Sequence, residues 1–367
     1  MLHYVKSTHC GYCDQKKEPI DAWSLPSVYE LMQGKGYPNN CSLSDPSGEC
    51  TLQMYEQRMM DGWRRSGDYM YKPDLLRSCC RQYPIRTNYS MFVNDGFHNK
   101  STKKSIRRFY REMTGSEITT TNLEEMYNFY DKGSDRFFTV LMPDSFGLDK
   151  FDLFRKYQIS AHNETEEEVT PESFYRFLCS NPFEQLDINW IEVNREWGKG
   201  NYNSKALQSL VGPVHECYII DGELAAIAVL DILPTSVSSV YFMWDPKHAK
   251  LGLGTVSAIR EIMLAKLLHK DHYYLGFYIP DCAKMVYKAK FGGEIRNFDT
   301  SGDIEWVKLK DVDHKMKDGK LHVFDSNNLD IAEQLYGVAT HCLDESYIHS
   351  FDPVESTQLS PMPELVP

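Results

Sequence analysis

The chain has 367 residues, of which 42% are apolar and 25% charged, and these ordinary values exclude collagen, a coiled coil and wholesale disorder as its overall class. Its 52 acidic residues outnumber its 40 Lys and Arg, which gives a net charge of −12 at pH 7. Nucleic-acid binding through a generally basic surface is therefore excluded, and any RNA contact must use a local basic patch.

The sequence shows no sign of membrane insertion or secretion. No stretch approaches the roughly 20 apolar residues that span a bilayer, and the first ten residues lack the apolar core of a signal peptide. We therefore expect a cytoplasmic or nuclear protein without a membrane partner. In a reducing compartment, its ten cysteines favour metal binding, redox chemistry or packing over a disulfide scaffold.

The first 95 residues hold six of the ten cysteines and many turn signals, which predicts a loop-rich domain that needs a cross-link such as a bound metal. Cys10 and Cys13 form a C-x-x-C turn, and Cys79 and Cys80 follow 65 residues later. Four thiolates suit tetrahedral zinc or an iron–sulfur cluster. The alternative is one reactive C-x-x-C pair with two buried cysteines, and further candidate ligands are Cys41, Cys50 and His9.

Residues 98–114 predict a helix with one basic face. Its cations recur at i, i+3, i+4 and i+7: Lys104, Arg107, Arg108 and Arg111. Apolar residues, among them Ile106 and Phe109, fall on another side and predict a docking face. A strand is expected at 137–142, and the acidic run 163–168 before the Thr170-Pro171 helix start is a candidate hinge.

From residue 213 onward the pattern alternates between strands and helices. The expected elements, in order, are strands at 214–220, 224–233 and 238–244, a helix at 255–269, a strand at 273–279 and a short helix at 282–289. An Asp221-Gly222 hairpin turn separates the first two strands. The simplest arrangement is a mixed α/β sheet with one parallel crossover. We expect domains at 1–150 and 151–310 and an extension at 311–367.

Several motifs, ordered along residues 9–295, resemble one enzyme family. The amino-terminal motifs are Cys-Gly-Tyr-Cys (10–13), Arg-Arg-Ser-Gly (64–67) and Cys-Cys-Arg-Gln-Tyr-Pro-Ile-Arg (79–86). The later motifs include Val-His-Glu-Cys-Tyr (214–218), Ser-Val-Tyr-Phe-Met-Trp-Asp-Pro (239–246) and Tyr-Leu-Gly-Phe-Tyr-Ile (274–279). Together they resemble arginyl-tRNA–protein transferases.

That resemblance implies a reaction, a fold and a cofactor. Arginine would move from its charged tRNA to the α-amine of a protein that begins with Asp, Glu or oxidised Cys, and the ubiquitin ligase machinery would read the product. The catalytic half would resemble the GNAT acetyltransferase fold, and the amino-terminal domain would hold zinc or a 4Fe–4S cluster on Cys10, Cys13, Cys79 and Cys80. The centre would be structural or regulatory, and no coenzyme A is expected.

The chemistry of amine attack on an ester suggests catalytic residues. An α-ammonium has a pKa near 8, so a base of moderate strength suffices, and no covalent intermediate is needed. His215 is the first candidate base, although a strand cannot turn both His215 and Glu216 toward the substrate. Asp231 interrupts an apolar run, where a carboxylate is costly unless paired, so it is the leading candidate partner of the arginyl side chain.

Other side chains are candidates for substrate contact. Asp245 and Glu216 are alternative acids for the arginyl group, although Asp245 also suits a turn cap. Tyr241 is a candidate oxyanion donor. Tyrosines that would line the pocket are Tyr274 and Tyr278, and cations that would bind an acidic acceptor are Arg65, Arg81 and Arg86.

For tRNA, the basic helix and a two-glycine loop are the candidates. Gly252 and Gly254 match the acetyltransferase phosphate loop, but Ala249 replaces its basic or amide residue, so we expect this loop to bind the tRNA terminus. Two rival functions stay open at this stage. One is an acetyl-coenzyme-A-dependent acetyltransferase, and the other is a non-enzymatic zinc adaptor that binds tRNA.

Overall fold

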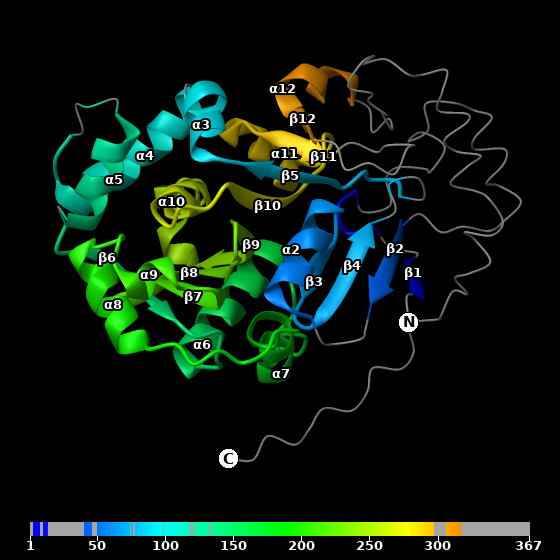
Figure 1. The fold of residues 1–367 in the computed structure, drawn as a ribbon, viewed down its shortest axis with the longest axis horizontal. Coiled ribbons are helices and arrows are strands. Elements are labelled where there is room, and N and C mark those ends of the chain that lie inside the picture. The colour runs from blue at the N-terminus through cyan, green and yellow to red at the C-terminus, as the bar shows by residue number, and fades with distance from the viewer. Residues whose placement is uncertain are drawn as a thin grey trace, which may run out of the picture.

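The computed structural model describes residues 3–7, 10–13, 40–45, 50–73, 75, 78–97, 99–117, 120, 122–132, 134–296 and 306–316. Within these ranges, every helix is too short or too polar to cross a bilayer. The described chain forms two sheets with helices packed around the larger one (Figure 1).

The smaller sheet has four strands in the order β1-β2-β4-β3, and the larger has eight in the order β12-β11-β5-β10-β9-β8-β7-β6. The small-sheet strands are β1 His3–Ser7, β2 Asn40–Asp45, β3 Arg64–Ser66 and β4 Tyr69–Pro73. The large-sheet strands are β5 Tyr83–Thr87, β6 Phe137–Met142, β7 Gly212–Ile220, β8 Glu223–Ile232, β9 Ser236–Trp244, β10 His272–Tyr278, β11 Glu294–Arg296 and β12 Trp306–Lys308.

The α-helices of the described ranges vary from single turns to four turns. They are α2 Leu52–Met60, α3 Tyr89–Met91, α4 Lys100–Thr114, α5 Leu123–Lys132, α6 Leu148–Tyr157, α7 Pro171–Phe174, α8 Trp190–Lys199, α9 Lys205–Gln208, α10 Leu253–Leu267, α11 Ala283–Val286 and α12 Leu309–Val312.

The centre of the large sheet follows the order that the sequence predicts. Strands β7, β8 and β9 form an antiparallel meander, and the Asp221-Gly222 turn joins the first two with both residues at positive φ. Helix α10 then crosses over, and β10 pairs parallel to β9. The expected mixed α/β sheet with one parallel crossover is confirmed, because only a crossover connection can return the chain in the same direction.

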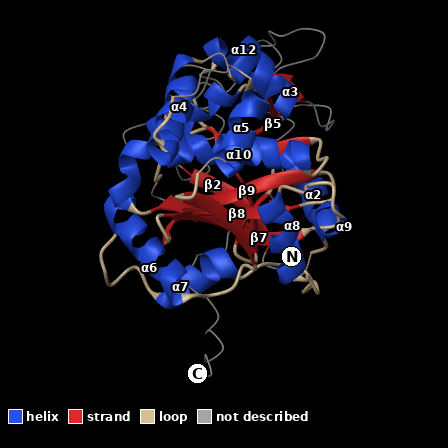
Figure 2. Cartoon of the chain, turned by 90° about the vertical axis from the view of Figure 1, so that its left-hand side faces the viewer, coloured by secondary structure: helices blue, strands red, loops and turns tan. Residues whose placement is uncertain are grey.

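The alternation of β8 separates two cores on the two faces of the sheet. Ala226, Ala228 and Leu230 pack on the α10 side, whereas Ile227 and Val229 pack on the side of α6 and α7. Figure 2 shows α10 on one face and α6 and α7 on the other. Both faces of this strand are therefore buried, which explains its nearly continuous apolar run.

Helix α4 has the two faces that its sequence predicts. Asn99 caps its first turn, accepting from Ser101 N at 2.9 Å, and Gly115 ends it in the left-handed conformation. Apolar residues of the helix, among them Ile106 and Phe109, are buried against the main core. The basic face of the helix points outward, and the helix packs on α10.

The large sheet contains strands from both predicted domains, 1–150 and 151–310. Strands β5 and β6 come from the first 150 residues, yet β5 pairs with β10 and β6 pairs with β7. Helix α12 likewise runs across residue 311, and the extension beyond 316 lies outside the described residues. The expectation of a loop-rich amino-terminal domain missed α2 and the four-stranded sheet, whose short strands carry little periodicity.

Candidate functional site

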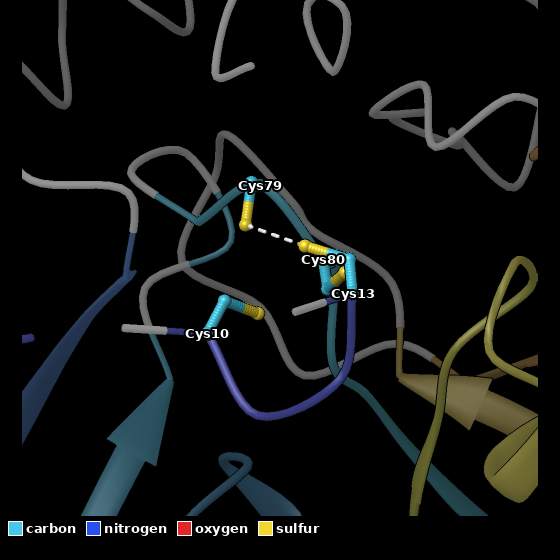
Figure 3. Close-up of side chains that lie close together, drawn as sticks. All are labelled: Cys10, Cys13, Cys79 and Cys80. Atoms are coloured by element: carbon cyan, nitrogen blue, oxygen red, sulfur yellow. Dashed lines mark hydrogen bonds between the residues drawn. The ribbon is translucent and has the colours of Figure 1, made fainter. Parts of the chain in front are cut away.

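Four cysteine sulfurs converge on one point. The Sγ atoms of Cys10, Cys13, Cys79 and Cys80 all lie within 4.8 Å of one another, and Cys13 Sγ lies 3.6 Å from Cys79 Sγ (Figure 3). Cys10, Cys79 and Cys80 are buried, and Cys13 is partly buried. A soft, all-sulfur donor set at this spacing fits a bound metal such as zinc. The structure therefore confirms that the four predicted ligands come together.

The cysteine centre packs against the end of β10. Ile279 and Cys282 are buried with it, and Tyr12 OH donates to Gln82 Oε1 at 3.2 Å. Cys50, one alternative ligand, is buried in a separate cluster with Tyr55 and donates its thiol to a backbone carbonyl. His9 and the side chain of Cys41 lie outside the described part.

Asp231 and Arg65 bind each other. Arg65 Nε and Nη2 donate to the two Asp231 carboxylate oxygens at 2.8 and 2.7 Å, and both side chains are almost fully buried. Arg65 Nη1 also donates to the carbonyls of Gly67 and Ser180. The bidentate pair occupies both side chains in this structure. The predicted roles of Asp231 toward the arginyl group and of Arg65 toward the acceptor stay predictions and would require the pair to separate.

Glu216 is also ion-paired. Arg260 Nη2 donates to Glu216 Oε1 at 2.9 Å, and both side chains are at most 2% exposed. The expectation that His215 and Glu216 face opposite sides is confirmed, because Glu216 meets α10 whereas His215 lies on the α6 face. Arg260 balances the charge of Glu216 in this structure, and its binding of a substrate guanidinium stays a prediction.

His215 is a buried structural residue. Its Nε2 lies 3.0 Å from Leu178 O, and its Nδ1 lies 3.2 Å from Lys150 Nζ, so both ring nitrogens are engaged. Complete burial, with Lys150 nearby, lowers the pKa of His215 to about 3. The imidazole is thus enclosed with both ring nitrogens engaged, and the role of His215 as the base stays a prediction that would require it to become exposed.

Tyr241 lies in a polar and aromatic group that includes a second histidine. Its OH donates to Gln158 Oε1 at 2.7 Å and lies 3.2 Å from Nε2 of His162, which is exposed. Desolvation and Lys284 lower the pKa of His162. Sequence reasoning missed His162, because a histidine in an acidic loop carries no local pattern. Its imidazole is exposed, unlike that of His215.

The other predicted substrate residues mostly make structural contacts. Asp245 Oδ1 accepts from Lys247 N at 3.0 Å, so it caps the turn after β9. Tyr274 packs under the Arg64 guanidinium, and Tyr278 OH donates to Asp313. Both tyrosines are nearly fully buried in this structure, and their roles in lining the substrate pocket stay predictions.

The remaining two arginines are engaged as well. Arg81 is 1% exposed, and its guanidinium donates to the carbonyl of Leu75. Arg86 Nε donates to Glu294 Oε1 at 3.0 Å, and its guanidinium lies 4.1 Å from the Trp306 ring centroid. Neither side chain presents a free cation to an acidic acceptor here.

The pairing between β9 and β10 stops early. It joins His272 to Ser236 and continues only to Tyr274 and Ser238. Beyond this point β9 stays with β8 as far as Trp244, whereas β10 stays with β5. The register of β10 shifts between Tyr274 and Phe277, where Gly276 takes a φ of 80°. We call the unpaired part of this strand pair the β9/β10 split.

A buried carboxylate contacts hydroxyl groups near the β9/β10 split. Glu261 on α10 is buried and accepts from Tyr273 OH at 2.5 Å and from Ser257. Burial raises the pKa of Glu261, and hydrogen bonds from Ser257, Tyr273 and Ser239 oppose that rise. Unlike Glu216, Glu261 has no cationic partner in the described residues.

Tyr287 is placed between the two faces. Burial, and to a smaller extent the charge of Glu261, raises the pKa of Tyr287 to about 12. Burial, and to a smaller extent Tyr287, raises the pKa of Tyr157 to about 12. Glu261 belongs to α10 on one face and Tyr157 to α6 on the other, so Tyr287 lies within electrostatic reach of both. This position suits a residue that lines the split, and no local pattern in the sequence marks it.

The two predicted tRNA elements lie side by side. Lys104, Arg107 and Arg111 are exposed on α4, and together with neighbouring cations they line a hollow of about 380 Å³. A Cβ added at Gly252 would lie 2.5 Å from Arg108 Nη2, whereas one at Gly254 would meet nothing within 4 Å. The basic face of α4 therefore adjoins the start of α10, where backbone N–H groups favour anions.

Comparison with known proteins matches both halves of the chain. Family models described as the N terminus and C terminus of arginine-tRNA-protein transferase match residues 8–104 and 149–296. Arginyl-tRNA–protein transferase 1 of Saccharomyces cerevisiae is 32% identical over 352 residues, which cover 91% of this chain and 67% of that protein. The protein of the same name from Arabidopsis thaliana is 31% identical over 60% of this chain.

A bacterial relative carries a different name. The aspartate/glutamate leucyltransferase of Pseudoalteromonas atlantica is 28% identical over 65% of this chain and 78% of its own length. The chain spans about two thirds of the yeast relative but only a third of the Arabidopsis one. With both family models matched in order, the chain belongs to the arginyl-tRNA–protein transferases, a family of aminoacyltransferases.

Proposed function

We propose that this chain transfers arginine from arginyl-tRNA to the α-amine of proteins that begin with Asp, Glu or oxidised Cys. The observation that carries the proposal is the match of both family models on one chain. The name of the bacterial relative, an aspartate/glutamate leucyltransferase, supports an acidic acceptor. The arginine added to the acceptor would then be read by ubiquitin ligase machinery, in the cytoplasm or nucleus.

The β9/β10 split is our proposed site of aminolysis. The acceptor nitrogen attacks the ester carbonyl, the carbon–oxygen ester bond breaks, and the terminal ribose hydroxyl of the tRNA leaves with a proton. His162 takes the proton from the α-ammonium, and backbone N–H groups of β9 beyond Ser238, with Tyr241, stabilise the oxyanion. The parallel strands with a split resemble the GNAT fold, which we retain as a proposal.

Glu261 is our proposed partner for the arginyl side chain. The acids expected for this role, Asp231 and Glu216, already neutralise arginines of the chain, whereas Glu261 is held by neutral hydroxyl groups. Its neighbour Ser239 lies just past the last β9–β10 pair. A guanidinium entering the split would replace those hydroxyl contacts with a charge-assisted pair.

Arg-tRNA would bind across α4 and the start of α10. The exposed cations of α4 would contact phosphates, and the open space at Gly254 would let the tRNA terminus approach the helix, with Arg108 beside Gly252. The cysteine centre would hold zinc or an iron–sulfur cluster and tie residues 10–13 to residues 79–80. The close sulfur spacing favours a single ion, because each thiolate of a 4Fe–4S cluster binds a different iron.

The test is a comparison of donors on one acceptor. The protein is incubated with a peptide beginning with Asp and with arginyl-tRNA, leucyl-tRNA or acetyl-coenzyme A, and product mass is read. We expect the addition of one arginine residue. Leucine addition would assign the activity of the bacterial relative, acetylation would assign the GNAT chemistry, and binding of tRNA without product would assign a zinc adaptor.

A further inference from the structure

Two cations near the bulge of β10 lack an acidic partner among the described residues. Arg64 Nη2 donates to Gly276 O at 3.2 Å, and Lys288 Nζ donates to Phe277 O at 2.9 Å. Both side chains therefore converge on consecutive carbonyls of one strand. In the described part of the chain, neither cation has a carboxylate within ion-pair distance.

The surroundings of these two cations are aromatic. The Arg64 guanidinium lies 5.3 Å from the ring centroids of both Tyr274 and Phe277. Burial, and to a smaller extent the positive charge of Arg64, lowers the pKa of Lys288 to about 7. The thiol of Cys282 acts in the opposite direction and raises this pKa. Burial likewise lowers the pKa of Arg64, opposed by Tyr55, Tyr274 and Tyr71. The groups that oppose the two shifts are thus a thiol and phenols rather than carboxylates.

Three other enclosed arginines of this fold are paired with acids. Arg65 has Asp231, Arg260 has Glu216 and Arg86 has Glu294. Backbone carbonyls replace part of the water around these cations, with three hydrogen bonds from Arg64 and one from Lys288. No carboxylate of the described residues balances their charge, and this costs folding free energy. That cost is expected where an anionic ligand completes the site.

The position fits the acceptor more closely than the tRNA. Lys288 donates to Phe277 O on β10, the strand that borders the β9/β10 split. Arg64 is 5% exposed, whereas Lys288 is partly exposed, so an incoming anion meets the ammonium first with the guanidinium behind it. Such an enclosed place admits a carboxylate, whereas the exposed cations of α4 suit an RNA backbone.

We propose that Lys288, supported by Arg64, binds the side-chain carboxylate of the acceptor's first residue. This inference rests on the proposed function, because it names the part of the site that selects an acidic amino terminus. Lys288 makes the direct contact, and Arg64 is a positioning residue that fixes the bulge carbonyl and adds positive potential. The α-amine of the same residue then lies beside the split.

The experiment measures acceptor selectivity. Peptides that begin with Asp or with the neutral isostere Asn are arginylated by wild type, Lys288→Met and Lys288→Arg, and kcat/KM is compared. We expect Lys288→Met to lower the Asp-to-Asn ratio by about ten-fold or more, because a hydrogen bond to a charged group is removed. The loss appears in KM for the Asp peptide, and Lys288→Arg restores part of it.

A matched control and a second variant keep the result interpretable. Lys290→Met removes another partly buried lysine from the same short segment and leaves the ratio unchanged. Arg64→Gln lowers the ratio less than Lys288→Met does. Thermal unfolding and metal content are measured for each variant, so that a misfolded protein or an emptied metal centre is recognised.

Three results would overturn the inference. An unchanged Asp-to-Asn ratio in folded Lys288→Met excludes the carboxylate contact. Weaker binding of arginyl-tRNA with unchanged selectivity assigns the cations to RNA, and loss of metal with unchanged selectivity assigns them to the charge balance of the cysteine centre. If wild type transfers no arginine to either peptide, the proposed function fails instead.

Discussion

At the residue scale, buried charge separates structural from functional side chains. Asp231 was identifiable from sequence as an acid that needs a partner, and the structure pairs it with Arg65. The identity of the partner was not predictable, because Arg65 lies 166 positions earlier and only the fold brings the two together. A charged residue in an apolar run therefore predicts that it has a partner of opposite charge. Whether the residue is structural or binds substrate depends on whether that partner belongs to the protein itself.

The Asp231–Arg65 pair gives a stability prediction. Asp231→Ala leaves a buried guanidinium without its carboxylate, so we expect a loss of about 3–5 kcal/mol of unfolding free energy in denaturant titration. The double variant Asp231→Leu with Arg65→Met should recover most of it. The control is Asp221→Ala, which breaks the exposed pair with Arg136 and should cost less than about 1 kcal/mol. Equal losses for Asp231→Ala and Asp221→Ala would refute this view.

His215 gives a prediction about acid stability. Its pKa is about 3 in the folded chain and near 6.5 when unfolded, so the unfolded chain binds more protons between these values. The free energy of unfolding should therefore fall on acidification from pH 6.5 to 3, by at most about 1.4 kcal/mol per pH unit from this group.

His215→Asn should flatten that slope and still transfer arginine. Unfolding free energy against pH is the measurement. A slope that His215→Asn leaves intact, or complete loss of transfer in a folded variant, would show that His215 titrates differently or acts in catalysis.

At the element scale, periodic patterns were the reliable guide. The predicted strand–helix order between 212 and 278 and the two faces of α4 are confirmed, because their apolar spacing is set by which side is buried. Strand β5 could not be assigned to the large sheet from its five residues, since its partners β10 and β11 lie about two hundred positions later. Short strands with distant partners leave no local signal.

Helix α4 carries the tRNA prediction. Reversing Lys104 and Arg107 to Glu should weaken binding of arginyl-tRNA and flatten its salt dependence by about 0.7–0.9 in logarithmic slope for each phosphate that the helix no longer neutralises. Reversing the exposed Lys199 and Lys205 should have a smaller effect. Electrophoretic or fluorescence titration across salt concentrations measures the slope, and an unchanged slope would remove α4 from the tRNA interface.

The loop before α10 gives a sharper version of the same test. Gly254→Ala adds a methyl group into open space, so the protein should fold normally. A lower affinity for arginyl-tRNA in this variant would then report that the tRNA terminus fills that space. Unchanged affinity and turnover would show that the loop is only a turn between strand and helix.

At the scale of the whole molecule, the cysteine centre joins segments far apart in sequence. Cys10 and Cys13 come from near the amino terminus, and the centre packs on Ile279 and Cys282 beyond β10. We therefore expect Cys80→Ser to lose the metal and to loosen the packing against Ile279. The variant should raise KM for acidic peptides more than it lowers the rate of the chemical step. Metal analysis with visible absorbance distinguishes zinc from an iron–sulfur cluster.

Turnover and acceptor choice are measured for the same variant. If Cys80→Ser loses the metal and retains wild-type selectivity and rate, the centre neither shapes nor regulates the acceptor site. If transfer stops while the peptide still binds, the centre takes part in the reaction itself.

The central claim is that this chain moves an arginyl group directly from tRNA to an amino terminus. The most direct measurement is a single-turnover reaction with radiolabelled arginyl-tRNA and a peptide that begins with Asp. We predict that label passes to the peptide without a labelled protein intermediate and without any other energy source. Release of the label as free arginine, or its retention on tRNA by the metal-loaded protein, would contradict the account.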